Sequence, residues 1–194
     1  MINIQPNITY GIMLSGGIDS AVLMYLVLKE FIVKGIPPTL HSFTIPKTDG
    51  AELYVENIIS YMESRFDIKL PLPIIVGDPT LHHSRQGISA VYEIKAKYRY
   101  IDKLFFGSNK VPSIELSGTA PKRLEDTSGF IITPFWDCYK TEIIKLALEN
   151  NLNELFDITH TCTEQQIGRC NQCWQCNERA WAFKELGHID TGTK

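Results

Sequence analysis

The sequence predicts a doubly wound α/β fold built on a mostly parallel five-stranded sheet, followed by a C-terminal cysteine-rich segment. Three observations support this prediction. Short apolar runs alternate with segments of helical periodicity, which is typical of a parallel sheet covered by helices on both faces. A glycine-rich turn at 15–20 separates the first apolar run from the first helical pattern. Four cysteines cluster between positions 162 and 176.

The elements follow in order along the chain. The predicted strands are bounded by Gly, Pro, Asp and Ser, and they cover residues 8–14, 39–45, 72–76, 104–107 and 130–133. The first helix follows Asp19, which we expect to cap it, and stops at the Gly-Pro-rich stretch 35–38. Later helices are predicted at 51–66, 87–102, 141–150 and through Trp181 and Phe183. The stretch 111–128 is rich in Pro, Gly, Ser and Thr and is predicted to be an irregular loop.

The length and the net charge of the chain limit the classes of function that it can have. With 194 residues the chain is long enough for one full α/β domain. Its formal net charge of −3 gives no general attraction to nucleic acid or to anionic membranes. No apolar run approaches the roughly 18 residues that span a bilayer, and the first ten residues lack the pattern of a signal peptide. We therefore expect a cytoplasmic protein with no membrane contact and no direct nucleic-acid partner.

The turn after the first strand has the properties of a phosphate-binding loop. Gly16 and Gly17 let the backbone N–H groups face a ligand, and the following helix adds the positive end of its dipole. Ser15 and Ser20 add hydroxyl groups. Asp19 would repel a bare phosphate, so we expect it either to cap the helix or to contact magnesium. The alternative interpretation is an ordinary glycine turn with a helix cap.

The cysteines have the spacing C-x7-C-x2-C-x2-C, at Cys162, Cys170, Cys173 and Cys176. Four thiolates complete a closed tetrahedral site, so we predict a structural Zn²⁺. An iron–sulfur cluster also uses four thiolates, and a C-x2-C pair can be redox-active. In this interpretation residues 1–158 form the nucleotide-binding domain and 159–194 a zinc-binding tail packed on it. Cys138 lies outside the set and is expected to be a small buried residue.

The loop 15–20, Ser-Gly-Gly-Ile-Asp-Ser, resembles that of the PP-loop ATP pyrophosphatases, which split ATP between its α and β phosphates. The loop and the cysteine set together resemble, more narrowly, the 7-cyano-7-deazaguanine synthase family. The tail at 161–183 looks like the signature of that family, and 136–151 contains its Lys-x-Glu-Ile helix start at Lys140 and Glu142. Gln86 is a departure, since the family usually has Arg-Asn where this chain has Arg85-Gln86.

This resemblance implies a fold, a reaction and its partners. The fold would be the adenine nucleotide alpha hydrolase-like (HUP) form of the doubly wound sheet. The implied enzyme is an AMP-forming ligase that uses ATP and Mg²⁺. It would adenylate the carboxylate of 7-carboxy-7-deazaguanine, form the amide with ammonia, and then use a second ATP to form the nitrile. The expected partners are therefore a deazapurine and ammonia, and the resemblance also suggests a homodimer.

The resemblance also suggests residue roles near the ATP phosphates. Ser15, Gly16, Gly17 and Ser20 would hold phosphate, and Asp19 would orient the loop or magnesium. Lys140 would neutralise charge that develops on pyrophosphate, although it can also be a solvated first-turn lysine.

The remaining roles lie at strand ends and on flanking segments. Phe43 and Thr44 end the second strand and would contact adenine through backbone groups, unless they are simply strand core. Gly107 follows the fourth strand and is expected at the nucleotide. Arg85 would reach the phosphates or the substrate carboxylate, and Arg179 would steady the cysteine loop or reach the site.

Other functions remain open at this point. A related enzyme could stop at the amide, or adenylate a different carboxylate. A sulfur-transferring PP-loop enzyme would need Cys138 as an additional reactive cysteine. A non-catalytic zinc module that binds nucleic acid or protein is a different class, but the tail from 160 to 194 holds equal numbers of basic and acidic residues, which argues against a phosphate-binding surface.

Overall fold

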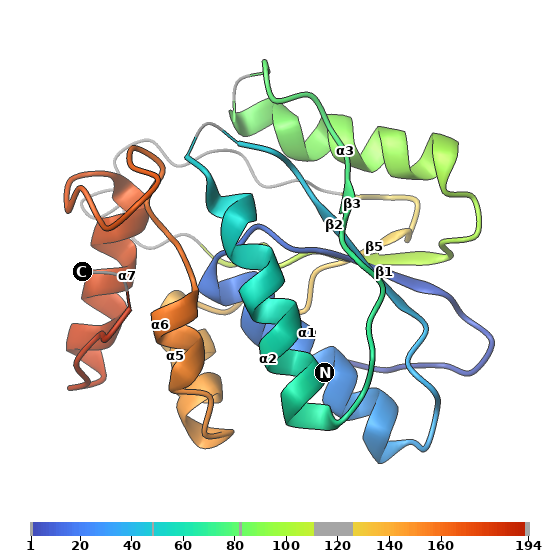
Figure 1. Cartoon of the computed structure of the whole chain (residues 1–194), viewed down its shortest axis with the longest axis horizontal. Coiled ribbons are helices and arrows are strands. Elements are labelled where there is room, and N and C mark those ends of the chain that lie inside the picture. The colour runs from blue at the N-terminus through green and yellow to red at the C-terminus, as the bar shows by residue number, and fades with distance from the viewer. Residues whose placement is uncertain (1, 48, 82, 111–125, 193–194) are drawn as a thin grey trace.

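The computed structural model describes residues 2–47, 49–81, 83–110 and 126–192. Most of the loop predicted at 111–128 lies outside the described residues. A parallel sheet of five strands has the order β3-β2-β1-β4-β5. Figure 1 labels β1, β2, β3 and β5 of this sheet between the helices. The strands are β1 Tyr10–Met13, β2 Leu40–Thr44, β3 Ile74–Ile75, β4 Lys103–Phe105 and β5 Ile131–Ile132. The predicted five-stranded α/β fold is confirmed.

Helices cover both faces of this sheet. The longer ones are α1 Ile18–Val33, α2 Val55–Phe66, α3 His83–Lys97, α5 Lys140–Glu149 and α7 Trp174–Glu185, with the shorter η1 Ala51–Tyr54 and α6 Glu154–Ile158. Figure 1 shows α3 on one side of the sheet and α1 and α2 on the other, with α7 beside α5 and α6 at one end. None of the helices in the described part of the chain combines the length and the apolar character that crossing a membrane requires.

Alternating side chains of the strands divide the core into two parts. Tyr10, Ile12 and Phe105 pack with α1, α2, α5 and α7. Met13 and Leu104 point to the other face and pack against α3. Both faces of the central strands are therefore buried, as expected for a parallel sheet between two helical layers.

Several predicted boundaries differ from the observed ones. Strand β3 has only two residues where 72–76 was predicted, because Pro71 and Pro73 have no N–H to donate to a neighbouring strand. Helix α3 begins at His83 rather than at Gly87. Gly87 was predicted to start the helix, but it lies within the first two turns. The short helix α6 was not predicted; it has five residues, too few for a clear periodicity.

The predicted capping role of Asp19 is wrong. The N-cap of α1 is Gly17, in an extended conformation, and Asp19 lies within the first turn of the helix. A carboxylate in the first turn still interacts favourably with the helix dipole. Its side chain is directed elsewhere, toward Lys140.

Candidate active site and metal site

The end of β1 lies at the point where the strand order of the sheet reverses. The chain leaves β1 toward β2 on one side, whereas β4 lies on its other side. In open parallel sheets, ligands bind outside the carboxyl ends of the strands at this position. Ser15 follows β1 and Gly107 follows β4, so the sheet brings together two of the predicted nucleotide-binding segments.

The loop 15–20 has a backbone that only glycine permits at Gly16. Its φ is +79°, and a Cβ at this position would lie 1.9 Å from the carbonyl oxygen of Ala51. Gly107 also packs closely against the loop, because a Cβ there would lie 3.2 Å from the backbone nitrogen of Ser20. Both glycines thus allow backbone segments to pack tightly around the start of α1.

The two serine hydroxyl groups hold the loop in shape. The N–H of Gly17 donates to Ser15 Oγ at 3.3 Å, and the N–H of Ser15 donates to Ser20 Oγ at 3.2 Å. Ser20 Oγ in turn donates to the carbonyl oxygen of Gly17 at 3.1 Å. The loop is therefore preformed, with its N–H groups at the positive end of a 16-residue helix.

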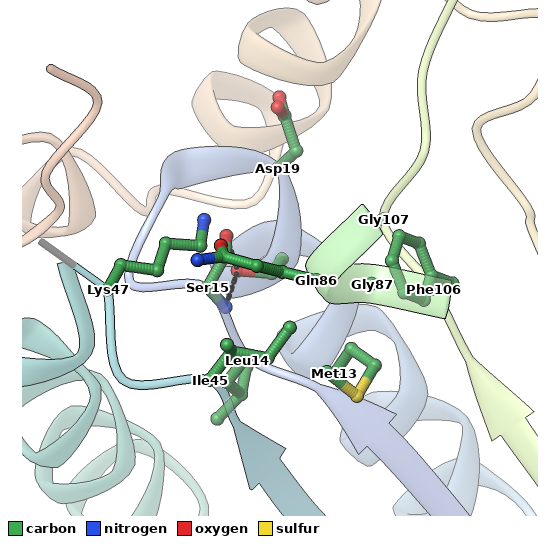
Figure 2. Close-up of a pocket in the computed structure, with 11 residues that line it drawn as sticks. Met13, Leu14, Ser15, Asp19, Ile45, Lys47, Gln86, Gly87, Phe106 and Gly107 are labelled. Carbon is green, nitrogen blue, oxygen red and sulfur yellow. Dashed lines mark hydrogen bonds between the residues drawn. The ribbon is translucent and has the colours of Figure 1, made fainter. Parts of the chain in front are cut away.

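A first cavity, of about 190 Å³, opens beside this loop. Met13, Ile45 and Phe106 form apolar walls, and the polar lining includes Ser15, Ser20, Asp19, Lys47 and Gln86, with Gly107 at its edge. Figure 2 shows Lys47 and Gln86 extending toward Ser15 from opposite sides, with the carboxylate of Asp19 directed away from them. An apolar wall beside a polar loop suits a nucleotide, which has a flat base and a charged tail.

A second cavity, of about 140 Å³, lies between the same loop and the cysteine segment. It shares Ser15, Asp19 and Lys47 with the first cavity, and its lining also includes Lys140, Glu178, His160 and Trp174. His160 is 1% exposed, and neither of its ring nitrogens has a hydrogen-bond partner among the described residues. The two cavities therefore meet at the loop.

Lys140 is buried between two carboxylates. Its Nζ lies 2.6 Å from Asp19 Oδ2 and 3.1 Å from Glu178 Oε2. Burial alone would lower the pKa of Lys140, but the carboxylates of Asp19 and Glu178 raise it well above its ordinary value. Lys140 is thus a fixed cation at the loop and not a solvated first-turn lysine.

The same cluster affects Glu178. Burial raises the pKa of Glu178, and the nearby charge of Asp19 acts in the same direction, while Lys140 opposes both. Asn109 Nδ2 donates to Glu178 Oε1 at 3.0 Å. Asp19 Oδ1 is buried and has no hydrogen-bond partner within the described residues, so one lone-pair face of this carboxylate is open to a cation.

The start of α5 explains how Lys140 is aimed. Lys140 is the first residue of the helix, and Glu142 Oε2 accepts a hydrogen bond from the N–H of Tyr139 at 2.7 Å. This contact caps the helix in the manner of a capping box. The Lys-x-Glu-Ile pattern in the sequence therefore couples a fixed helix start to a buried lysine.

Four predicted site residues do not line either cavity: Gly16, which packs against Ala51, and Phe43, Thr44 and Arg85. Phe43 is fully buried in the core below α3, and Thr44 is 4% exposed. Their carbonyl groups accept hydrogen bonds from Leu14 N–H and Val76 N–H in the sheet, so these groups are not available to adenine. Ile45, one residue further along, lines the first cavity instead. Arg85 is exposed on α3, next to the cavity-lining Gln86.

The sequence analysis did not identify Lys47 or His160 as site residues. Lys47 follows the end of β2 by three residues, and its position at the carboxyl edge of a predicted strand was the available signal. For His160 no pattern pointed to the loop. The structure shows the connection, because its backbone N–H donates to the carbonyl oxygen of Gly16 at 2.9 Å.

The four cysteines form a cluster suited to a metal. Their Sγ atoms lie within 4.8 Å of one another, comparable with the roughly 3.8 Å between sulfurs in a tetrahedral site with Zn–S bonds of about 2.3 Å. Backbone N–H groups also point at the sulfurs, from Cys173 to Cys170 Sγ at 3.2 Å and from Cys170 to Cys162 Sγ at 3.4 Å. Donors in these positions stabilise thiolates, as a metal site requires.

The ionisation of two of these thiols differs. The hydrogen bond from Cys173 N–H lowers the pKa of Cys170 to about 7. Burial raises the pKa of Cys176, so this thiol needs the charge of a bound cation to ionise near neutral pH. Cys138 is half-buried and lies apart from the cluster.

Arg179 holds the end of the chain rather than the site. It is fully buried, and its guanidinium makes two contacts with the carboxylate of Asp190, at 2.8 and 2.9 Å. It also donates to the carbonyl oxygen of Phe156 at 2.8 Å and to Thr161 Oγ1 at 3.1 Å. Of its two suggested roles, the structure supports steadying the cysteine segment.

Comparisons with known proteins agree with the fold. The NMN synthetase from Francisella tularensis superposes with a TM-score of 0.52 at 16% identity, covering 93% of this chain and 78% of that one. At this identity the likeness concerns the fold alone. This chain therefore has an α/β fold with a Ser-Gly-Gly loop at the switch point, the arrangement that the resemblance to the PP-loop enzymes predicts.

Sequence comparisons narrow this class. The family model described as queuosine biosynthesis protein QueC matches residues 114–187. The 7-cyano-7-deazaguanine synthase of Acetivibrio thermocellus is 26% identical over 93% of this chain and 95% of its own length. That of Marinomonas sp. is 42% identical over 60 residues, which are 31% of this chain and 26% of the relative. The predicted resemblance to the 7-cyano-7-deazaguanine synthase family is confirmed.

Proposed function

We propose that this chain is an ATP-dependent carbon–nitrogen ligase that converts 7-carboxy-7-deazaguanine and ammonia to 7-cyano-7-deazaguanine. The observation that carries the proposal is the position of the loop 15–20 between two cavities that meet at Ser15, Asp19 and Lys47. One cavity can hold the nucleotide and the other the acceptor, with the α-phosphate between them. The matches to the QueC family model and to curated synthases support the choice of acceptor.

The residues of the loop act on the phosphates. The N–H groups around Gly16 and Gly17 and the N-terminus of α1 hold the pyrophosphate portion. Lys140 and Lys47 place two positive charges beside it, which stabilises the charge that develops as pyrophosphate leaves. Asp19, whose Oδ1 has no hydrogen-bond partner among the described residues, would contact the magnesium ion that accompanies ATP.

The reaction proceeds by two activations. A carboxylate oxygen of the substrate attacks the α-phosphorus, and the bond to pyrophosphate breaks. Ammonia then attacks the carbonyl carbon, AMP leaves with the electron pair of the C–O bond, and the nitrogen loses one proton to give the amide. The amide oxygen attacks a second ATP in the same way, and loss of AMP and of both nitrogen-bound protons gives the nitrile. AMP is a far better leaving group than hydroxide or oxide, which is the chemical reason for spending ATP.

The cysteine cluster has a structural role in this proposal. Cys162, Cys170, Cys173 and Cys176 would hold a Zn²⁺, and four thiolate ligands favour a structural role over a catalytic one. The segment that carries them supplies His160, Trp174 and Glu178 to the second cavity. The metal therefore orders one wall of the acceptor site.

Mass spectrometry of the products tests this function. The metal-loaded protein is incubated with Mg-ATP, ammonium and 7-carboxy-7-deazaguanine, with a Ser15→Ala variant as a control. The expected product is the nitrile, strongly reduced in the variant. The amide alone would indicate an enzyme that stops after the first activation. If the deazapurine is unchanged and another carboxylate is adenylated, the proposed substrate is incorrect.

A further inference from the structure

Three distant segments of the chain meet at the carboxylate of Glu178, and a fourth is connected to it through Lys140. This side chain belongs to α7, the helix that contains Cys176, and it is 1% exposed. Its Oε2 lies 3.1 Å from Lys140 Nζ at the start of α5, and its Oε1 accepts a hydrogen bond from Asn109 after β4. Through Lys140 it is connected to Asp19 in α1. Both of its oxygens are therefore engaged within the protein.

The contacts of Lys140 show why a second carboxylate matters. A lysine side chain has four flexible bonds and a compact charge, so one ion pair leaves its ammonium free to pivot. Asp19 alone is 20% exposed and belongs to the loop that must also accept ligands. Glu178 lies on the side of Lys140 nearer the cysteine helix and fully inside the protein. Two anchors define the position of Nζ, whereas one does not.

Burial makes these contacts strong. The side chain of Lys140 is 5% exposed, and charges in such surroundings interact far more strongly than in water. A buried ion pair contributes to geometry even where its net contribution to stability is small. Asn109 occupies the other oxygen of Glu178, so the carboxylate cannot rotate away from Lys140 without losing a second contact.

We propose that Glu178 is a positioning residue that holds the Lys140 ammonium against the loop 15–20. This inference rests on the proposed function, in which Lys140 stabilises the departing pyrophosphate. Glu178 acts through Lys140 and does not touch the reacting atoms. It also provides a direct structural path from the cysteine segment to the phosphate loop.

A double-mutant cycle tests this role. The variants are Glu178→Gln, Lys140→Met and the double variant, and the initial rate of AMP formation is measured against ATP concentration. We expect Glu178→Gln to reduce kcat by about 10- to 100-fold, with KM for ATP within about threefold, because the affected interaction acts in the transition state. The double variant should be no slower than Lys140→Met, since Glu178 has no target without the lysine.

The control variant is Glu185→Gln, which removes the same charge from an exposed position at the end of α7. It should leave kcat unchanged. Metal content and thermal unfolding are measured for every variant, so that loss of the metal or of the fold is recognised. If the effects of Glu178→Gln and Lys140→Met multiply in the double variant, Glu178 does not act through Lys140 and the inference is overturned.

Hydrogen exchange gives a second readout that does not depend on the reaction. In Glu178→Gln the amides of 15–20 should exchange faster than in the unmodified chain and in Glu185→Gln. If the protein forms no AMP with any acceptor, the proposed function is overturned. The hydrogen-exchange rates of the loop amides would still test the positioning role of Glu178. Unchanged exchange together with unchanged kcat would overturn the positioning role itself.

Discussion

At the scale of single residues, the loop depends on a glycine that no other residue can replace. Gly16 combines a positive φ with a Cβ position 1.9 Å from a backbone oxygen. Its environment therefore penalises a side chain twice, once through backbone strain and once through a clash. Gly35 has a positive φ as well, but a Cβ there would meet nothing within 4 Å, so the two positions separate these effects.

We expect Gly16→Ala to abolish ATP binding or to weaken it by more than about tenfold, because η1 and the loop must move apart. Gly35→Ala should cost only about 1 kcal/mol of stability, from the strained backbone, and should leave ATP affinity unchanged. Isothermal titration with Mg-ATP and urea unfolding measure the two effects. Equal ATP affinities for the two variants would contradict the tight packing of the loop.

Much of the loop could be predicted at this scale, but not its surroundings. Ser15, Gly16 and Asp19 lie within five consecutive residues, so one short motif identified all three. Lys140 was predicted from a family pattern, but its burial between Asp19 and Glu178 depends on contacts between residues 121 positions apart and between two helices. Lys47 and His160 are brought to the loop by tertiary structure alone, and no local pattern marks such residues.

At the scale of elements, the last helix is fastened to the domain by buried charge. Arg179 in α7 and Arg169 both contact the carboxylate of Asp190, whose side chain is 8% exposed. Burial would raise the pKa of Asp190, but the two arginines lower it below its ordinary value overall. A carboxylate with a lowered pKa in the folded protein stabilises the fold above its unfolded pKa, and this contribution is lost as the pH falls through the lower, folded value.

Asp190→Asn should therefore destabilise the protein at pH 7, by about 3 kcal/mol, because the buried guanidinium of Arg179 and the half-buried guanidinium of Arg169 lose their counter-charge. The difference in unfolding free energy between the variant and the unmodified chain should shrink as the pH falls below about 4. Urea unfolding at a series of pH values measures this difference. A difference that stays constant down to pH 2 would show that Asp190 contributes by packing and not by charge.

Elements differed in how well the sequence predicted them. The five strands and the long helices have clear apolar periodicity, and their order was predicted correctly. The predicted ends of elements were wrong where something other than apolar periodicity sets the boundary of a strand or helix. Pro71 and Pro73 shorten β3, while Gly17 rather than Asp19 caps α1 because Asp19 turns to Lys140. A residue with two available partners cannot be assigned to one of them from local sequence.

At the scale of the whole molecule, the cysteine segment and the loop 15–20, the proposed nucleotide site, form one structure. Helix α7 begins within the cysteine cluster and places Glu178 beside Lys140. His160 precedes Cys162 by two residues, and its backbone N–H donates a hydrogen bond to the carbonyl oxygen of Gly16. If the cysteines bind the expected metal, its loss should therefore disturb the second cavity as well as the tail. The predicted division at residue 158 separates the chain by composition, whereas the site draws on both parts.

We expect one metal ion per chain, lost together with a large part of the thermal stability when a strong chelator is added or when Cys176 is replaced by Ser. Elemental analysis and thermal unfolding measure both. A Cys138→Ser variant should keep the metal, since this thiol lies apart from the cluster. If the protein contains iron and shows a visible absorption band, the site holds an iron–sulfur cluster and not zinc. Retention of the metal in Cys176→Ser would contradict the four-thiolate site.

The central claim is that the loop 15–20 directs cleavage of ATP between its α and β phosphates. The most direct measurement is phosphorus NMR of the nucleotide products after incubation with Mg-ATP, ammonium and 7-carboxy-7-deazaguanine. The account predicts AMP and pyrophosphate in equal amounts, both lost in Ser15→Ala. Formation of ADP and orthophosphate, or AMP formation unaffected by Ser15→Ala, would contradict it.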